Sequence, residues 1–109
     1  MSGLNVAVAF KFEEFITRRL QYMFYYTYIL QSQKDQSLYI GYTRDLKKRF
    51  KRHNNGESRA TKPFRPYNLI FYEAFLNRID AKNREEYLKS GYGRRTIKTL
   101  LKTFYLKIY

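Results

Sequence analysis

Two stretches decide the fold: residues 24–30 (FYYTYIL) and residues 38–42 (LYIGY). Both are rich in aromatic and branched side chains, which favour β-strands. The segment between them is polar and contains Lys34-Asp35, a turn signal. Because two strands joined by a short polar link form a β-hairpin, a hairpin is predicted here.

A helix over residues 45–54 is predicted to follow the hairpin. Thr43 suits the N-cap position, and Asp45 suits the first turn, where its charge meets the positive end of the helix dipole. Gly56 is expected to end the helix in a left-handed conformation. Residues 56–66 contain both prolines of the chain and are predicted to form a loop.

The rest of the chain is predicted to form one strand and two helices, over residues 67–75, 79–90 and 94–108. Asn77 is the expected N-cap of the first of these helices, and Gly91 and Gly93 are expected to end it. The resulting order, β-β-α-β-α-α, predicts an α/β (α+β) fold in which a small three-stranded antiparallel sheet is flanked by helices.

The sequence suggests a division at residue 23. Residues 23–109 contain all the elements above and are expected to form the folded domain. Residues 1–22 are expected to be an N-terminal extension, either a weak amphipathic helix with apolar residues such as Phe15 and Leu20 or a tail. An alternative is that Met23 is the natural start of the protein.

Composition limits the chemistry that the chain can perform. The 109 residues suit one domain, and the absence of cysteine excludes disulfides, thiolate nucleophiles and cysteine-based zinc sites. No apolar run approaches the roughly 20 residues that span a bilayer, and no signal peptide is recognisable. A cytoplasmic protein is therefore expected.

The net charge of +13 is the strongest bulk signal, with 22 Lys and Arg against 9 Asp and Glu. Such an excess repels itself in a compact body and points to a polyanionic partner. Nucleic acid is the leading candidate and an anionic membrane surface is the second. The membrane is disfavoured because the apolar stripe of the last helix is needed to cover the sheet.

The helix over residues 45–54 places two chemically interesting side chains on one face. At about 100° per residue, Arg49 and His53 both lie beside the apolar direction that Leu46 and Phe50 define. A partly buried guanidinium needs an anionic partner, which is either a structural carboxylate or a substrate phosphate. His53 taken alone is more often a structural histidine than a catalyst.

Basic side chains are also predicted on the outward face of this helix and in the loop that follows. A solvated surface is one interpretation, and contact with the phosphates of a nucleic acid is the one favoured by the net charge. The candidate nucleic-acid-binding residues are Lys47, Lys48, Lys51, Arg52, Lys62 and Arg65.

The helix over residues 79–90 directs a carboxylate inward. Ala81 and Leu88 define its inner face, Glu85 lies between them, and Glu86 points away. An inward carboxylate is costly unless it is paired with a base or bound to a metal. A salt bridge to Arg49 or another base is one possibility. The other is a hard-cation site, since Mg²⁺ often uses one or two carboxylates and several waters.

The predicted strands carry further candidates. Tyr28 and Tyr39 lie on paired strands, where a tyrosine usually packs its ring and hydrogen-bonds its hydroxyl. Glu73 on the third strand shares the phase of Leu69 and Phe71 and is a reserve acid. None of these residues alone indicates an enzyme.

Taken in order along the chain, these residues resemble the GIY-YIG nuclease family, named after two short motifs on adjacent strands. The second motif is present as Tyr39-Ile40-Gly41. The first is present as Thr27-Tyr28-Ile29, which departs from the family's glycine and isoleucine. The resemblance covers residues 24–101 and is greatest to small stand-alone members related to the UvrC-like nuclease domain of excinuclease.

The resemblance implies a metal-dependent endonuclease that hydrolyses phosphodiester bonds, in DNA rather than RNA, with a role in repair or recombination. One divalent cation, Mg²⁺ or Mn²⁺, would be held by Glu85. The substrate's structure, any protein partner and the oligomeric state are not indicated.

The resemblance also implies roles for the remaining candidates. Tyr28 or Tyr39 would orient or deprotonate the attacking water, and Arg49 would stabilise charge on the phosphoryl oxygens. His53 and Tyr42 would assist at the nucleophile or the leaving group. A free tyrosine has a pKa near 10, so it needs nearby positive charge to act as a base at neutral pH.

Two other functions fit the charge. One is a nucleic-acid-binding module without catalysis, which would use phosphate contacts and exposed tyrosines but would gain nothing from Glu85 in its groove. The other is a structural or assembly protein on an RNA-rich complex.

Overall fold

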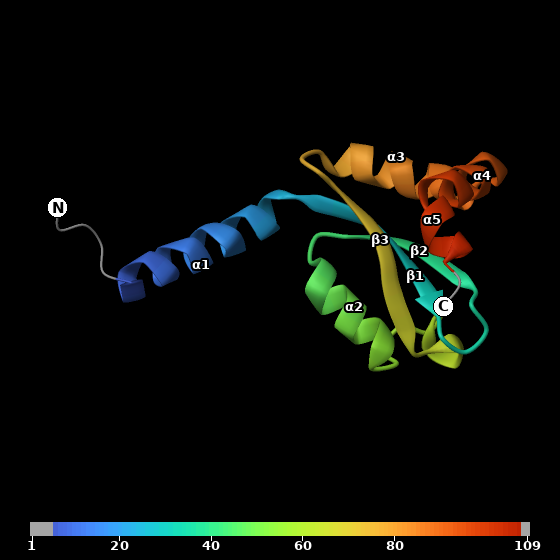
Figure 1. The fold of residues 1–109 in the computed structure, drawn as a ribbon, viewed down its shortest axis with the longest axis horizontal. Coiled ribbons are helices and arrows are strands. Elements are labelled where there is room, and N and C mark those ends of the chain that lie inside the picture. Colours follow the sequence, from blue (N-terminus) through green and yellow to red (C-terminus); the bar gives the residue numbers. More distant parts are fainter. Residues whose placement is uncertain (1–5, 108–109) are drawn as a thin grey trace.

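A three-stranded antiparallel sheet lies between helices on both faces in the computed structural model, which describes residues 6–107 (Figure 1). The elements are, in order, α1 (Val6–Met23), β1 (Tyr25–Ser32), β2 (Leu38–Thr43), α2 (Leu46–Asn54), a 3₁₀ turn (Lys62–Phe64), β3 (Tyr67–Phe75), α3 (Arg78–Lys89), α4 (Gly91–Leu100) and α5 (Lys102–Leu106). The predicted α+β fold and the predicted β-β-α-β-α-α order are confirmed.

The first strand is the centre of the sheet, whose strand order is β2-β1-β3. It pairs antiparallel with both neighbours, and Tyr28 lies opposite Gly41 on one side and Tyr72 on the other. Strand β2 is therefore an edge strand. Central strands are buried on both faces, which explains the nearly continuous apolar and aromatic run in this part of the sequence.

Each face of the sheet has its own core. Tyr28, Leu30 and Tyr67 are buried on the face that α2 covers. Ile29 is buried on the opposite face against Leu88 of α3 and Ile97 of α4. Successive residues of β1 thus pack into opposite cores, because successive side chains of a pleated strand point to opposite faces of the sheet.

The ends of α2 differ in part from the prediction. Asp45, not Thr43, is the N-cap, because its carboxylate accepts a hydrogen bond from the Lys48 amide. Thr43 lies just before the helix, where its hydroxyl accepts a hydrogen bond from the Asp45 amide at 3.1 Å. Gly56 has a φ of 78°, which confirms the predicted left-handed residue after the helix.

The junction of α3 and α4 corrects the prediction for the two glycines. Asn77 caps α3 as expected, but Gly91 and Gly93 lie inside α4 and do not end α3. Ser90 separates the helices and caps α4 by accepting from the Gly93 amide at 3.1 Å. A Cβ at Gly93 would collide with the backbone at Leu88, so a close helix–helix approach requires this glycine.

Two further expectations need correction or restriction. The helix predicted over residues 94–108 is divided at Leu101 into α4 and α5, and residue 108 lies outside the described residues. On β3, a register shift places Leu69 in the core under α2 and Phe71 in the opposite core. Glu73 therefore does not share a face with Leu69, because the irregularity reverses the alternation between them.

Helix α1 confirms the helical interpretation for Val6–Met23 and projects from the rest of the molecule (Figure 1). Its described apolar side chains Phe15, Ile16 and Leu20 are exposed. Among the described residues, no helix combines the length and the apolar character needed to cross a membrane.

Candidate active site

The hairpin brings Tyr28 against Gly41. A Cβ on Gly41 would collide with the ring and hydroxyl of Tyr28, which lies opposite it in the sheet. Glycine at the end of Tyr39-Ile40-Gly41 is thus explained by packing, because any side chain there would displace the tyrosine ring. Tyr28 is 1% exposed.

A chain of hydrogen bonds runs inward from the Tyr28 hydroxyl. This oxygen lies 2.8 Å from Nε2 of His53, whose Nδ1 lies 2.8 Å from Oγ1 of Thr61. His53 and Thr61 are both fully buried. Helix α2 supplies the histidine, and its end is held against β3 by Asn54, whose amide bonds to both backbone groups of Tyr67.

Arg49 and Tyr39 complete the group on this face of the sheet. The guanidinium of Arg49 is half-buried, and hydrogen bonding to Tyr28 and Tyr39 raises its pKa. The ring of Tyr39 lies 4.9 Å from that of His53 and 6.4 Å from that of Tyr28, centroid to centroid. The structure therefore brings together four of the residues singled out from the sequence.

Burial controls the protonation of the inner pair. It raises the pKa of Tyr28 to about 12, although hydrogen bonding to Arg49 opposes this shift. Burial, assisted by the positive charge of Arg49, lowers the pKa of His53 to about 4. At neutral pH the tyrosine is therefore protonated and the histidine is neutral.

Glu85 approaches this group from α3. Its side chain is 17% exposed, and its carboxylate pairs with Lys89 one turn along the helix at 3.2 Å. The carboxylate is close enough to Tyr28 to raise the pKa of the phenol. The inward orientation derived from the helix phase is confirmed, since Glu86 is exposed, but the salt-bridge partner is Lys89 and not Arg49.

The oxygen donors present fit a hard divalent cation held largely by water. The described residues include no cluster of three or more His, Cys, Asp or Glu side chains. Glu85 is a partly buried carboxylate that pairs with Lys89, whose side chain is 55% exposed. Mg²⁺ and Mn²⁺ accept such a donor set, because oxygen ligands suit them and Mg²⁺ keeps several waters.

The reserve acid Glu73 is engaged elsewhere. Its carboxylate accepts from Arg84 of α3 at 2.7 Å, and both side chains are about one-third exposed or less. Tyr42 also lies away from the group, on the α3 side of the sheet. Its ring stacks on Tyr25 at 6.2 Å, and Nζ of Lys82 lies 5.3 Å from its centroid.

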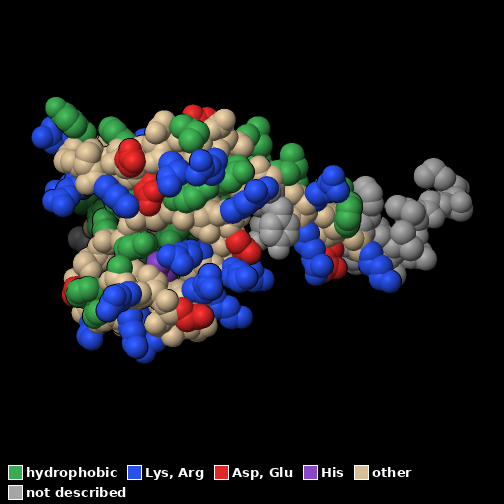
Figure 2. Space-filling model, turned by 180° about the vertical axis from the view of Figure 1, so that it is seen from behind, with side chains coloured by type: hydrophobic (Ala, Val, Ile, Leu, Met, Phe, Trp, Pro, Cys, Tyr) green, Lys and Arg blue, Asp and Glu red, His purple; other side chains and the backbone are tan. Residues whose placement is uncertain are grey.

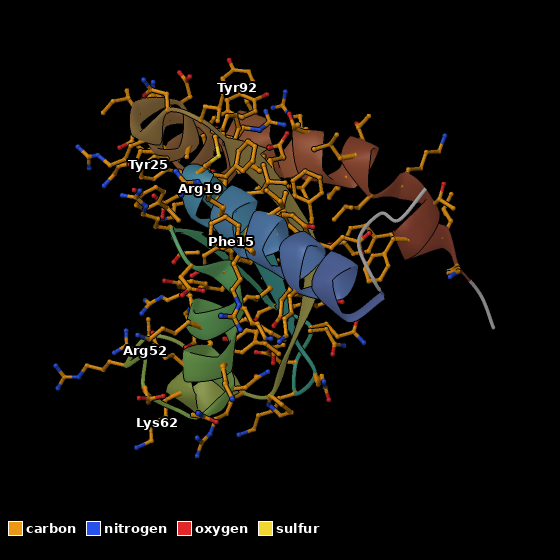
Figure 3. All side chains as sticks on the ribbon, turned by 90° about the vertical axis from the view of Figure 1, so that its left-hand side faces the viewer. Phe15, Arg19, Tyr25, Arg52, Lys62 and Tyr92 are labelled. Carbon is orange, nitrogen blue, oxygen red and sulfur yellow. The ribbon has the colours of Figure 1, made fainter. Side chains whose placement is uncertain are left out.

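The predicted nucleic-acid-binding side chains are all exposed, as expected: Lys47, Lys48, Lys51, Arg52, Lys62 and Arg65. Lys and Arg far outnumber Asp and Glu on the face shown in Figure 2. Arg52 of α2 and Lys62 of the 3₁₀ turn both project outward from the same side of the molecule (Figure 3).

A cavity of about 920 Å³ adjoins the group through Tyr39, and it is also lined by Lys89. Its floor is apolar and includes Ile40, Leu88 and Ile97. Its lining also includes the basic side chains Arg94, Lys98 and Lys102, whereas Tyr28, Arg49 and His53 do not line it.

Comparison with known protein families matches residues 24–98 to the GIY-YIG catalytic domain. The chain belongs to the GIY-YIG family. Among similar proteins is a UPF0213 protein of Clostridium perfringens, 46% identical over 65 residues, which cover 59% of this chain and 69% of the relative. A UPF0213 protein of Staphylococcus saprophyticus is 38% identical over 77 residues, covering 70% and 93%.

A third relative, the UPF0213 protein YsiG of Lactococcus lactis, is 39% identical over 84 residues, covering 76% of this chain and 80% of its own. The names of these relatives state no activity. No solved structure gave a significant match. The predicted resemblance to the GIY-YIG family is confirmed, and the closer relation to excinuclease stays a prediction.

Two residues of this GIY-YIG site were missed from the sequence. Lys89 follows Glu85 by four residues, the spacing at which two side chains of a helix form an ion pair. This spacing would have allowed Lys89 to be predicted. Thr61 lies in the irregular segment between α2 and β3, where no periodicity relates it to His53. Only the three-dimensional structure brings its hydroxyl to the imidazole.

Proposed function

We propose that this GIY-YIG protein is a metal-dependent endonuclease that hydrolyses phosphodiester bonds of DNA, with a role in repair or recombination. The observation that carries the proposal is the approach of Glu85 on α3 to Tyr28 on β1, beside the guanidinium of Arg49. An acid that acts on a phenol, which is itself hydrogen-bonded to a guanidinium, suits cation-assisted phosphoryl chemistry.

The two tyrosines have different surroundings and therefore different proposed roles. Tyr39 is the more exposed of the pair and orients the attacking water. The proton of that water passes to the Tyr28 oxygen as the Tyr28 proton passes to Nε2 of His53, 2.8 Å away. The hydroxide so formed attacks phosphorus, the bond from phosphorus to the leaving oxygen breaks, and this oxygen takes a proton from solvent water.

Arg49 stabilises the negative charge that develops on the phosphoryl oxygens. Its planar donor fork suits paired hydrogen bonds to a phosphate, and its half-buried position strengthens them. Glu85 would hold the Mg²⁺ or Mn²⁺ ion, which when bound supplies Lewis-acid polarisation of the phosphate and of a water molecule. Tyr42 keeps only a secondary proposed role, in positioning the end of β2.

Exposed cations around the site are proposed to hold the DNA backbone. The proposed residues are Lys47, Lys48, Lys51, Arg52, Lys62 and Arg65. Because cations that pair with phosphates release counterions, DNA affinity is expected to fall steeply as the salt concentration rises.

Plasmid nicking tests the proposal. Wild-type protein with Mg²⁺ or Mn²⁺ should convert supercoiled DNA to nicked circles, and EDTA should stop the reaction. Arg49→Ala should lower the rate by about 100- to 1,000-fold, the typical effect of losing one donor to a transition-state anion. Glu85→Ala should remove the metal dependence. A wild-type protein that leaves every DNA intact with either ion would contradict the proposal.

The second candidate is a nucleic-acid-binding module without catalysis. The ion pair between Glu85 and Lys89 favours it, because a lysine alone can satisfy the carboxylate. Tight, salt-sensitive DNA binding without nicking under any metal condition would support this function in place of the first.

A further inference from the structure

A small hollow lies beside Arg49, at the start of α2. It measures about 110 Å³ and is lined by Thr43, Asp45, Lys48, Arg49 and Arg52. A water molecule takes about 30 Å³ of the liquid, so the hollow has room for a group the size of a phosphate. Three cations against one carboxylate leave a positive excess, and the hydroxyl of Thr43 adds a neutral hydrogen-bonding group.

The single acid in this lining is already engaged. The Asp45 carboxylate accepts from the Lys48 amide at 3.1 Å as the N-cap of α2, so it faces the helix end. Its charge therefore compensates the helix dipole and weakens the field of the three cations only in part.

The hollow divides the basic side chains of α2 into two groups. Lys48 and Arg52 are one turn apart and line it together with Arg49, whereas Lys47 and Lys51 are absent from its lining. At about 100° per residue, the second pair lies roughly 160° around the helix from Arg49. One pair thus faces the candidate active site and the other faces away.

We propose that this hollow is a phosphate subsite that binds the backbone phosphate next to the scissile one. The proposal rests on the proposed nuclease function, because Arg49 is shared between the scissile phosphate and the hollow. It implies that the bound strand leaves the active site along the Thr43 side of α2 and not across its outward face.

Two double variants that remove equal charge from one helix test the subsite. Binding of a fluorescent DNA duplex is measured by anisotropy in EDTA between about 50 and 200 mM salt, so that no cleavage is needed. For Lys48→Ala with Arg52→Ala, the slope of log K against log salt should become shallower by about two. For Lys47→Ala with Lys51→Ala, the change should be clearly smaller.

Equal changes in the two double variants would overturn the subsite and indicate a diffuse basic face. Absence of DNA binding by the wild type would overturn it as well. All four side chains are exposed, so both variants should fold, which circular dichroism can verify. Nicking assays report on the proposed function separately, because a protein can lose the subsite and still cleave, or bind through it without cleaving.

A different observation concerns the buried hydrogen bonds behind Tyr28. Oγ1 of Thr61 donates to the Ser58 carbonyl at 3.4 Å and lies 2.8 Å from Nδ1 of His53. A carbonyl oxygen can only accept, so this contact favours a threonine hydroxyl that donates to Ser58 and accepts from His53. The Thr61 oxygen is then the acceptor for an Nδ1–H of His53, and Nε2 carries the lone pair that faces Tyr28.

We infer that Thr61 is a positioning residue that holds neutral His53 in its Nδ1–H form, so that Nε2 can accept the Tyr28 proton. This inference also rests on the proposed function. Threonine acts here through histidine and does not touch the substrate, since it is fully buried.

Nuclear magnetic resonance reads this state directly, because His53 is the only histidine of the 109-residue chain. Nitrogen shifts should show Nδ1–H in the wild type and in Thr61→Ser, which keeps the hydroxyl. Thr61→Val, of similar size, should lose this preference. Its single-turnover cleavage rate should fall at least about tenfold, with rescue by serine, as expected for a wrong tautomer.

An Nε2–H form in the wild type would overturn the inference. So would a Thr61→Val protein with unchanged nitrogen shifts, or one whose shifts change while its cleavage rate does not. If the wild type proves inactive, the nitrogen shifts still decide whether threonine sets the tautomer, and the failure then belongs to the proposed function alone.

Discussion

At the scale of single residues, Gly41 determines both the packing of the sheet and the position of the Tyr28 ring. Gly41→Ala should lower the free energy of unfolding by about 1 to 3 kcal/mol, because the new methyl group would collide with the Tyr28 ring. Urea denaturation measures this. Gly91→Ala is the matched control, since a Cβ at Gly91 meets nothing within 4 Å, and its stability should be unchanged or slightly higher.

Burial of His53 should make stability depend on pH. Its pKa falls from 6.5 to about 4 on folding, so between these values the unfolded chain binds more protons. The stabilisation is fully present above pH 6.5 and is lost as the pH falls toward 4, a total of about 3 kcal/mol. Urea denaturation across this range should show the loss in the wild type. His53→Gln should show a flatter profile, and equal slopes would contradict the assignment.

Much of the candidate site could be predicted at this scale from helix phase. The inward positions of Arg49, His53 and Glu85 follow from the turn of an α-helix and the nearest apolar neighbours. The contact between Thr61 and His53 could not be predicted, because it depends on the path of an irregular segment. The roles of all these residues stay predictions until activity is measured.

At the scale of elements, the α3–α4 junction shows where helix-end signals fail. Glycine after a helical pattern usually marks its end, but here the requirement for Gly93 is space between two helices. Similarly, an irregularity between β1 and β3 moved Leu69 to the other face of the sheet from Phe71. Neither the close contact of two helices nor a strand irregularity produces a periodic pattern in the sequence, so neither could be predicted from it.

Ser90 should stabilise this junction measurably. Its Oγ accepts from the Gly93 amide at 3.1 Å and donates to the Tyr87 carbonyl at 2.6 Å. Ser90→Ala should therefore lower the free energy of unfolding by about 1 kcal/mol, the usual cost of losing an N-cap. Ser90→Asp, which restores the acceptor, should recover most of this loss in the same urea experiment. Equal stability of wild type and alanine variant would contradict the capping role.

At the scale of the whole molecule, the sheet and the helices on its two faces form one body from which α1 projects (Figure 1). We propose that residues 23–109 fold by themselves, since the described apolar side chains of α1 are exposed. Deleting residues 1–22 should change the free energy of unfolding by no more than about 0.5 kcal/mol. Loss of cooperative urea unfolding in the truncated protein would show that the extension belongs to the domain.

The order of strands and helices could be predicted because segments rich in aromatic and branched residues indicate the strands. Apolar residues at helical spacing indicate the helices. The charge of +13 predicted a polyanionic partner but did not place it. Part of that charge lies on α2, where Arg49 connects the basic surface to the buried tyrosine. Location of the site is thus a property of the whole molecule that no single segment displays.

The most direct measurement of the central claim compares two adjacent glutamates on α3. Single-turnover cleavage of a labelled DNA duplex is followed against Mn²⁺ concentration for the wild type, Glu85→Gln and Glu86→Gln. Each variant loses one charge, but Glu85 is 17% exposed beside Tyr28 whereas Glu86 faces solvent. Glu85→Gln should lose at least about 100-fold in rate, and Glu86→Gln should match the wild type. Equal rates for the two variants would contradict the proposed metal-binding role of Glu85.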